Sequence, residues 1–379
     1  MAKTVVSAAR IKSMLANRHK EVTDIKKRLR LSADLSQMVA QDTEVDFEDI
    51  QAIATYFKKP WSYLLIDEAE AFPNKDHDNR THQNQQVPVS PELLETLQVT
   101  NYLLDTATEL FPDDTVKRPG FTISKTTKPS DIADRIRGFL KVTIAKQLAA
   151  KDEYEALRTW AEAVQAQGIY VLQRRLKDDT VRAFSLTRNN HAIMVVDTGD
   201  TPYARIFSIL HEYCHILLKN TGICDLDEHS STESYCNQFA AEVLLPKSLI
   251  DKELKGFSFT GNLDEDEETV KTLSHHFRVS QAALMIRLNS DDVGILPDNL
   301  YSQLETRRRS RNGGRRGSGG DYYRTKINAV GKRYAQNVFG ALSEGTINRS
   351  DASVLLGVGE HLVERFKTEL FQTSSGAAS

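Results

Sequence analysis

The sequence predicts an α+β protein that is mostly helical and contains a small antiparallel sheet. Apolar residues recur at helical spacing along much of the chain, as in VSAARIKSML and SDIADRIRGFL. Three consecutive segments, GIYVLQRRL, VRAFSLT and HAIMVVDT, are instead rich in β-branched and aromatic residues and are bounded by polar turns. We therefore expect one sheet in the middle of the chain, covered on one side by helices, with helical units before and after it.

Composition narrows the class of protein. The net charge is −3 and 40% of the 379 residues are hydrophobic, a balance that demands neither a nucleic-acid nor a membrane partner. No apolar run approaches the roughly 20 residues that a membrane helix needs. The start of the chain lacks the apolar core of a secretory signal. Three cysteines do not make a disulfide framework in a chain of this size. We expect a reduced, cytoplasmic protein.

Changes in composition divide the chain into segments. A polar stretch, PNKDHDNRTHQNQQ, separates two helical patterns, and the second pattern opens at Ser90-Pro91 with an N-cap and a proline in the first turn. The basic stretch TRRRSRNGGRRGSGG separates the last helical unit. The predicted segments are a helix-turn-helix-like helical domain (1–72), a linker (73–90), the main domain (91–255), a helical extension (256–300), an Arg/Gly-rich linker (301–322), a C-terminal helical domain (323–372) and a disordered tail (373–379).

The N-terminal segment is a degenerate match to a helix-turn-helix. A recognition helix would lie near ADLSQMVAQDT, after VTDIKKRLRL. Four basic residues there could contact phosphates: Lys26, Lys27, Arg28 and Arg30. An amphipathic helix with a solvated basic face explains them equally well. The six arginines of TRRRSRNGGRR could likewise bind nucleic acid or form a solubilising linker, and we favour the linker.

The segment RIFSILHEYCHILLKN carries the clearest chemistry. His211 and His215 are four residues apart, so on a helix both imidazoles lie on one face, about 6 Å apart along the axis, and can bind one ion. Glu212 is rotated beside them, where a general base would stand. This is the H-E-x-x-H pattern of zinc peptidases. A plain apolar helix that happens to carry two imidazoles is the alternative, but burying unpartnered imidazoles is costly.

A catalytic zinc needs a third protein ligand and an open position. The longer pattern ending in a third histidine fails, because Leu218 and Thr221 stand where its glycine and histidine belong. Glu233, on the next predicted helix, can supply a carboxylate. Ser230 and Glu233 also fit a capping box, in which the glutamate binds the N-cap amide instead. Other candidate ligands in the intervening loop are Cys224, Asp225, Asp227, Glu228 and His229.

HEYCH, followed after a short loop by ESYCNQFAAEVLLP, resembles the ImmA/IrrE family of metallopeptidases. That family's pattern is HExxH followed by ExxAN-x-FA. KKPWSYLLIDE, FRVSQAALMIRL and GGDYYRTKINAVGKRYAQNVFGAL also look like segments of its longer members, which carry an N-terminal Xre-type helix-turn-helix. The resemblance covers most of the chain and implies a zincin-like metallopeptidase core.

Carried onto this sequence, the resemblance implies that His211, His215 and Glu233 bind Zn²⁺, that Glu212 is the catalytic base, and that Asn237 orients a ligand. The sequence departs from the family pattern at Cys236 and at Tyr213-Cys214, which puts substrate fit in doubt more than metal binding. The residue that stabilises the oxyanion stays open among His229, Tyr213 and Arg205.

The expected function is that of a zinc metalloendopeptidase which cleaves a specific protein partner. The resemblance implies a transcriptional repressor or regulator as that partner, in a stress, phage-defence or toxin-antitoxin type response. The alternative is a DNA-binding regulator or antitoxin-like protein that uses the peptidase fold without cleavage. DNA is an expected second partner only through the N-terminal domain, a homodimer stays open, and no membrane partner is expected.

Overall fold

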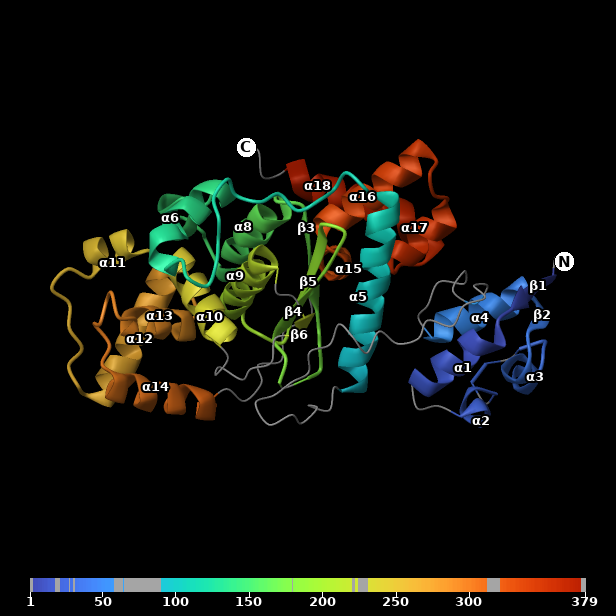
Figure 1. Ribbon diagram of the computed structural model, residues 1–379, viewed down its shortest axis with the longest axis horizontal. Helices are drawn as coiled ribbons and strands as arrows, with labels where there is room; N and C mark the ends of the chain where they lie inside the picture. The colour runs from blue at the N-terminus through green and yellow to red at the C-terminus, as the bar shows by residue number, and fades with distance from the viewer. Residues whose placement is uncertain are drawn as a thin grey trace. The chain divides into compact units, whose positions relative to one another are not determined.

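The chain forms two compact units, Met1–Asp78 with Leu97–Val99, and Asn79–Thr96 with Thr100–Ser379. Figure 1 shows their helices and strands in a computed structural model. None of the helices in the described part of the chain has the length and apolar character of a membrane span. The structure describes residues 3–17, 21–26, 28–29, 31–57, 64, 90–178, 180–219, 222–223, 231–311 and 321–375.

The first unit combines short helices with a two-stranded antiparallel sheet. Its elements are β1 (Lys3–Val6), α1 (Ala8–Asn17), α2 (Val22–Lys26), α3 (Leu35–Ala40), β2 (Thr43–Asp46) and α4 (Phe47–Phe57). Apolar side chains of all four helices pack with Val6 and Val45 into one core. The sequence did not reveal the two strands, because each has only four residues and β2 runs directly into α4.

The second unit contains a four-stranded sheet and many helices, so the prediction of a mostly helical α+β protein is confirmed. The strands are β3 (Ile169–Arg174), β4 (Ala183–Arg188), β5 (His191–Asp197) and β6 (Gly222–Ile223). The helices before the end of the sheet are α5 (Pro91–Leu110), α6 (Pro129–Leu140), α7 (Ile144–Leu148), α8 (Glu153–Gln165) and α9 (Pro202–Leu218). Those after it are α10 (Ser231–Leu244), α11 (Lys247–Glu253), α12 (Leu263–Phe277), α13 (Gln281–Asn289), α14 (Asp298–Arg311), α15 (Tyr322–Val330), α16 (Lys332–Glu344), α17 (Arg349–Leu356) and α18 (Val363–Ser375).

The sheet is mixed, with strand order β3-β5-β4-β6. β4 pairs antiparallel with β5 through a tight turn at Asn189 and Asn190, both with positive φ, as a two-residue hairpin requires. β4 also pairs antiparallel with β6. β5, however, runs parallel to β3, with Ile169 opposite Ala192. The expectation of a purely antiparallel sheet is therefore wrong for this pair, because the β4–β5 hairpin places β5 between β4 and β3.

Helices cover both faces of the sheet, which corrects the expectation of cover on one side. Figure 1 shows α8 and α9 on one side and α15 and α16 on the other, where the last two contact β3. All seven residues of β5 are buried as a result. A strand enclosed on both faces needs no alternation of polar and apolar residues, which explains the continuous apolar run AIMVV in this strand.

The C-terminal helices are joined to the sheet by a polar cluster around Asp114. Its carboxylate accepts hydrogen bonds from Tyr170 of β3 at 2.8 Å and from Arg333 Nε of α16 at 3.0 Å, and also from Asn337. At Gly331, φ is +88° and an added Cβ would lie 2.9 Å from the carbonyl oxygen of Val171. Glycine therefore allows the start of α16 to approach β3 closely.

The predicted linker at 301–322 is partly helical. α14 continues to Arg311 and α15 begins at Tyr322, while residues 312–320 lie outside the described residues. Arg307 binds Glu267 of α12 at 3.2 Å, so this part of the arginine run packs on its own unit. The first three residues of the predicted tail (373–379) belong to α18, which extends to Ser375, and residues 376–379 lie outside the described residues.

Candidate metal centre

Three side chains from two helices converge on one point. His211 and His215 come from α9, and Glu233 comes from the first turn of α10. The Nε2 atom of His211 lies 3.0 Å from Glu233 Oε2, and the Nε2 atom of His215 lies 3.3 Å from Glu233 Oε1. The two Nε2 atoms are 3.1 Å apart. The three ligand atoms all lie within 4.8 Å of one another.

The helices hold these groups through ordinary helix chemistry. The Thr201 side chain caps α9 by accepting a hydrogen bond from the amide of Ala204 at 3.3 Å, and Pro202 occupies the first turn. Ile206, Ile209 and other apolar residues of α9 belong to the same core as Phe239 and its neighbours on α10, and the two helices contact each other. The two helices are therefore fixed side by side, with the histidine pair facing the start of α10.

Glu233 points its carboxylate at the imidazoles. Both of its oxygens lie within 3.3 Å of an imidazole nitrogen, so the carboxylate reaches the histidine pair that the metal interpretation requires. The alternative capping residue, Ser230, lies outside the described residues, as do the loop candidates Cys224, Asp225, Asp227, Glu228 and His229.

The donor set fits a zinc ion. Bonds of about 2.0–2.1 Å in a tetrahedral site separate the ligand atoms by about 3.3–3.4 Å. The observed separations of 3.0, 3.1 and 3.3 Å are close to this spacing. Two imidazoles and one carboxylate are also the three protein ligands of a catalytic site that keeps a further position open.

His211 and His215 are buried, Glu233 is half-buried, and the three groups shift one another's pKa. Burial opposes the charged form of His215, but hydrogen bonds to Cys236 and Glu233 outweigh it and raise its pKa to about 11. The pKa of His211 is raised in the same way, because the hydrogen bond to Glu233 outweighs burial. Despite burial, the two imidazoles lower the pKa of Glu233 to about 2. These shifts show that the three groups hold protons between them; a zinc ion would replace the imidazole protons, because histidine binds a metal only in its neutral form.

Glu212 is enclosed beside this cluster. It is 0% exposed, and neither carboxylate oxygen has a hydrogen-bond partner in the described part of the chain. Its charge raises the pKa of both His211 and His215, which places it close to the two imidazoles. A buried carboxylate without partners is costly, so the fold keeps this group where local stability alone would not.

Cys236 is a contact that the sequence did not reveal. Its thiol hydrogen-bonds to His215 and to the neighbouring buried thiol of Cys214. The bond to Cys214, followed by that to His215, outweighs burial and lowers the pKa of Cys236 to about 6. The only sequence signal was its position three residues after Glu233, which places both on one face of α10.

The remaining predicted residues are less tied to the centre. Among the described residues, no hydrogen bond joins Asn237 to His211, His215 or Glu233, and its orienting role stays a prediction. Arg205 donates to Gln173 Oε1 at 3.0 Å, and Tyr213 is fully buried. No oxyanion-stabilising residue is assigned between these two.

The predicted nucleic-acid residues belong to the first unit. Lys26 pairs with Asp34 at 2.7 Å on the surface, and Arg28 is exposed. Lys27 and Arg30 lie outside the described residues. Exposed ion pairs of this kind are common, so DNA binding by this unit stays a prediction.

Residues 164–289 match the family model Peptidase_M78, the IrrE N-terminal-like domain. This matched stretch runs from the end of α8 to α13 and contains all three converging side chains. It supports the resemblance to the ImmA/IrrE family and indicates a metallopeptidase of that type. It does not extend to the first unit. No curated protein matches the chain.

Proposed function

We propose that the protein is a zinc-dependent endopeptidase in which His211, His215 and Glu233 hold the metal. The convergence of these three side chains within 4.8 Å carries the proposal. The match of residues 164–289 to a metallopeptidase family supports it independently. Cys214 and Cys236 are buried and form no disulfide, which fits a reducing compartment such as the cytoplasm.

Glu212 is the proposed catalytic base. Zinc, when bound, supplies Lewis acidity at the scissile carbonyl and acidifies water. Glu212 takes a proton from the attacking water and returns it to the leaving amide nitrogen. Its burial beside the imidazoles, with no partner among the described residues, leaves both oxygens available for this transfer. The imidazoles and Glu233 would hold the metal, and the burial of His211 and His215 limits the contact of their side chains with bulk water.

The proposed substrate is a specific protein partner, and the resemblance to the ImmA/IrrE family favours a transcriptional repressor or regulator. Such cleavage would relieve repression in a stress, phage-defence or toxin-antitoxin type response. The matched peptidase family supports a protein substrate, while the identity of the partner rests on the resemblance alone.

Glu212→Gln tests the proposal, because glutamine keeps the shape and removes the base. Cells that express the wild type or the variant are compared by mass spectrometry of newly formed protein N-termini. We expect cleavage to fall by roughly 10²–10⁴-fold, the usual contribution of a general base, with about one zinc per chain retained in both proteins. Glu268→Gln, an exposed glutamate on α12, is the control. Unchanged cleavage by Glu212→Gln contradicts the assigned mechanism.

A further inference from the structure

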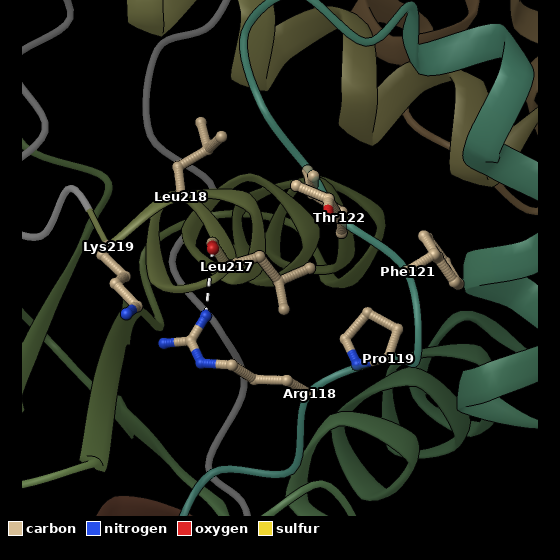
Figure 2. A pocket seen from close by; sticks show the side chains of 8 residues that line it. Arg118, Pro119, Phe121, Thr122, Leu217, Leu218 and Lys219 are labelled. Carbon is tan, nitrogen blue, oxygen red and sulfur yellow. Dashed lines mark hydrogen bonds between the residues drawn. The ribbon is translucent and has the colours of Figure 1, made fainter.

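A cavity of about 270 Å³ opens at the C-terminal end of α9. Figure 2 shows the segment that carries Arg118, Pro119, Phe121 and Thr122 passing beside the last turn of the helix. Five apolar residues contribute to its lining, Pro119, Phe121, Ile123, Leu217 and Leu218, although polar atoms make up the larger part of the surface that faces the cavity. The lining therefore combines apolar side chains with two basic residues, Arg118 and Lys219.

Arg118 fixes the cavity to the helix end. Its guanidinium donates to the carbonyl oxygen of Leu217 at 3.0 Å, drawn in Figure 2, and to that of Ile216 at 3.3 Å. The amide of Lys219 also donates to the Ile216 carbonyl at 3.2 Å. The guanidinium adds a side-chain donor for both carbonyls at the end of the helix, where backbone amides no longer follow in helical register. The chain leaves α9 at Lys219 in the left-handed conformation, with φ of +58°. Hydrogen bonds from Arg118 therefore hold the segment that lines the cavity against the end of α9.

The cavity neighbours the proposed metal centre. Leu218 lies three residues after His215, so the two side chains are neighbours on α9. The segment that lines the cavity continues to Lys125, whose amine donates to the hydroxyl of Thr232, directly before Glu233. One short stretch of chain therefore runs from the cavity to the helix turn that supplies the carboxylate.

The positive charge of the cavity lining favours a ligand with an anionic group. Within the described ranges, neither Arg118 nor Lys219 forms an ion pair with a carboxylate; Arg118 contacts only carbonyl oxygens among the contacts described above. Lys125, further along the same segment, also binds a hydroxyl. The positive charge of Arg118 and Lys219 attracts a carboxylate of a ligand.

The volume of the cavity suits one side chain of a bound peptide. The cavity volume is about 270 Å³. This is below the roughly 300–1,000 Å³ of pockets that bury a whole small molecule. We propose that the cavity is a substrate subsite that holds one large apolar side chain, with an acidic residue next to it, of the protein to be cleaved. This inference rests on the proposed function for its substrate class.

Peptide binding tests the subsite apart from catalysis. The probes are three fluorescein-labelled peptides, GSGLEGSG, GSGAEGSG and GSGLKGSG, and binding is followed by fluorescence anisotropy. The protein carries Glu212→Gln to prevent cleavage. We expect the Leu-Glu peptide to bind at least about tenfold more tightly than the Ala-Glu peptide, because burying a leucine side chain contributes on that scale. It should also bind more tightly than the Leu-Lys peptide, because a lysine is repelled by Arg118 and Lys219 where a glutamate is attracted. Equal affinities, or no binding of the Leu-Glu peptide, overturn the proposal.

Variants of the lining locate the binding. Thr122→Trp fills the cavity from its exposed rim and should remove the preference for leucine over alanine. Lys219→Glu should reverse the preference for glutamate over lysine. Lys128→Glu changes an exposed charge beyond the cavity and should leave both preferences unchanged. If Thr122→Trp and Lys219→Glu behave like this control, the cavity is not the subsite.

Chelation separates this proposal from the proposed function. No residue that lines the cavity is one of the three proposed metal ligands, so the affinity order of the three peptides should persist after treatment with a chelator. If the wild type binds no zinc but the order of peptide affinities persists, the proposed zinc peptidase is wrong and the proposed subsite is supported. If the protein cleaves a partner but binds the three peptides equally, the proposed peptidase is supported and the proposed subsite is wrong.

Discussion

Glu233→Ala should sharply weaken zinc binding. The Glu233 carboxylate lies 3.0 Å from His211 Nε2 and 3.3 Å from His215 Nε2, so it completes the donor set from a second helix. Residues that only orient a metal ligand cost about 10–100-fold in affinity when removed. Loss of a ligand itself should cost at least about 100-fold, equivalent to about 2.7 kcal/mol.

The same loss should appear in the stability of the fold. Free zinc at about 1,000 times the dissociation constant stabilises the folded protein by about 4.1 kcal/mol. At the same zinc concentration, a 100-fold weaker variant would gain only about 1.4 kcal/mol. The zinc-dependent part of the free energy of unfolding should therefore fall by about 2.7 kcal/mol, while the stability measured in chelator changes less.

Elemental analysis after dialysis and urea unfolding with and without zinc measure both quantities. Glu233→Gln, which keeps the size of the side chain, should behave like Glu233→Ala. Glu268→Ala is the matched control, because Glu268 is exposed and pairs only with Lys271, at 3.2 Å, among the described residues. If Glu233→Ala keeps about one zinc per chain with wild-type affinity, the third ligand lies elsewhere and our assignment of the site is wrong.

Two further predictions concern the attachment of the C-terminal helices. Asp114→Asn should lower the free energy of unfolding by about 1–2 kcal/mol, the value of charged hydrogen bonds discounted for a half-buried group. Burial is outweighed by the bond from Arg333 and by the other donors, which lower the pKa of Asp114 below its ordinary 3.8. Its stabilising contribution is therefore present above that value and is lost as the pH falls through the lowered pKa; the difference in urea midpoint between wild type and variant should shrink in acid, and a constant difference would contradict this. Gly331→Ala should destabilise by at least about 1 kcal/mol, because φ is +88° and the new Cβ would meet the Val171 carbonyl oxygen at 2.9 Å. Gly340→Ala, in the interior of α16 with open space around it, should instead stabilise by about 0.5–1 kcal/mol, and equal effects at the two glycines would refute the argument.

Much of the site was visible in the sequence because helix geometry is local. The four-residue spacing of His211 and His215 determines that both imidazoles share a face, whatever surrounds the helix. Thr201-Pro202 likewise marks the start of α9 in both sequence and structure. Apolar periodicity predicted a helix at SDIADRIRGFL, where α6 forms, for the same reason, since the pattern depends on neighbours within one or two turns.

Contacts between distant segments could not be read in this way. The sequence left Glu233 with two roles, and only the packing of α10 against α9 directs its carboxylate to the imidazoles. The contact of Cys236 with His215 has the same origin. Likewise, the parallel pairing of β3 with β5 depends on how the β4–β5 hairpin packs beside β3, and the cover of the second face of the sheet depends on α15 and α16, more than a hundred residues away. Local patterns determined which helices form, whereas the free energy of packing across the whole unit decided which side chains meet.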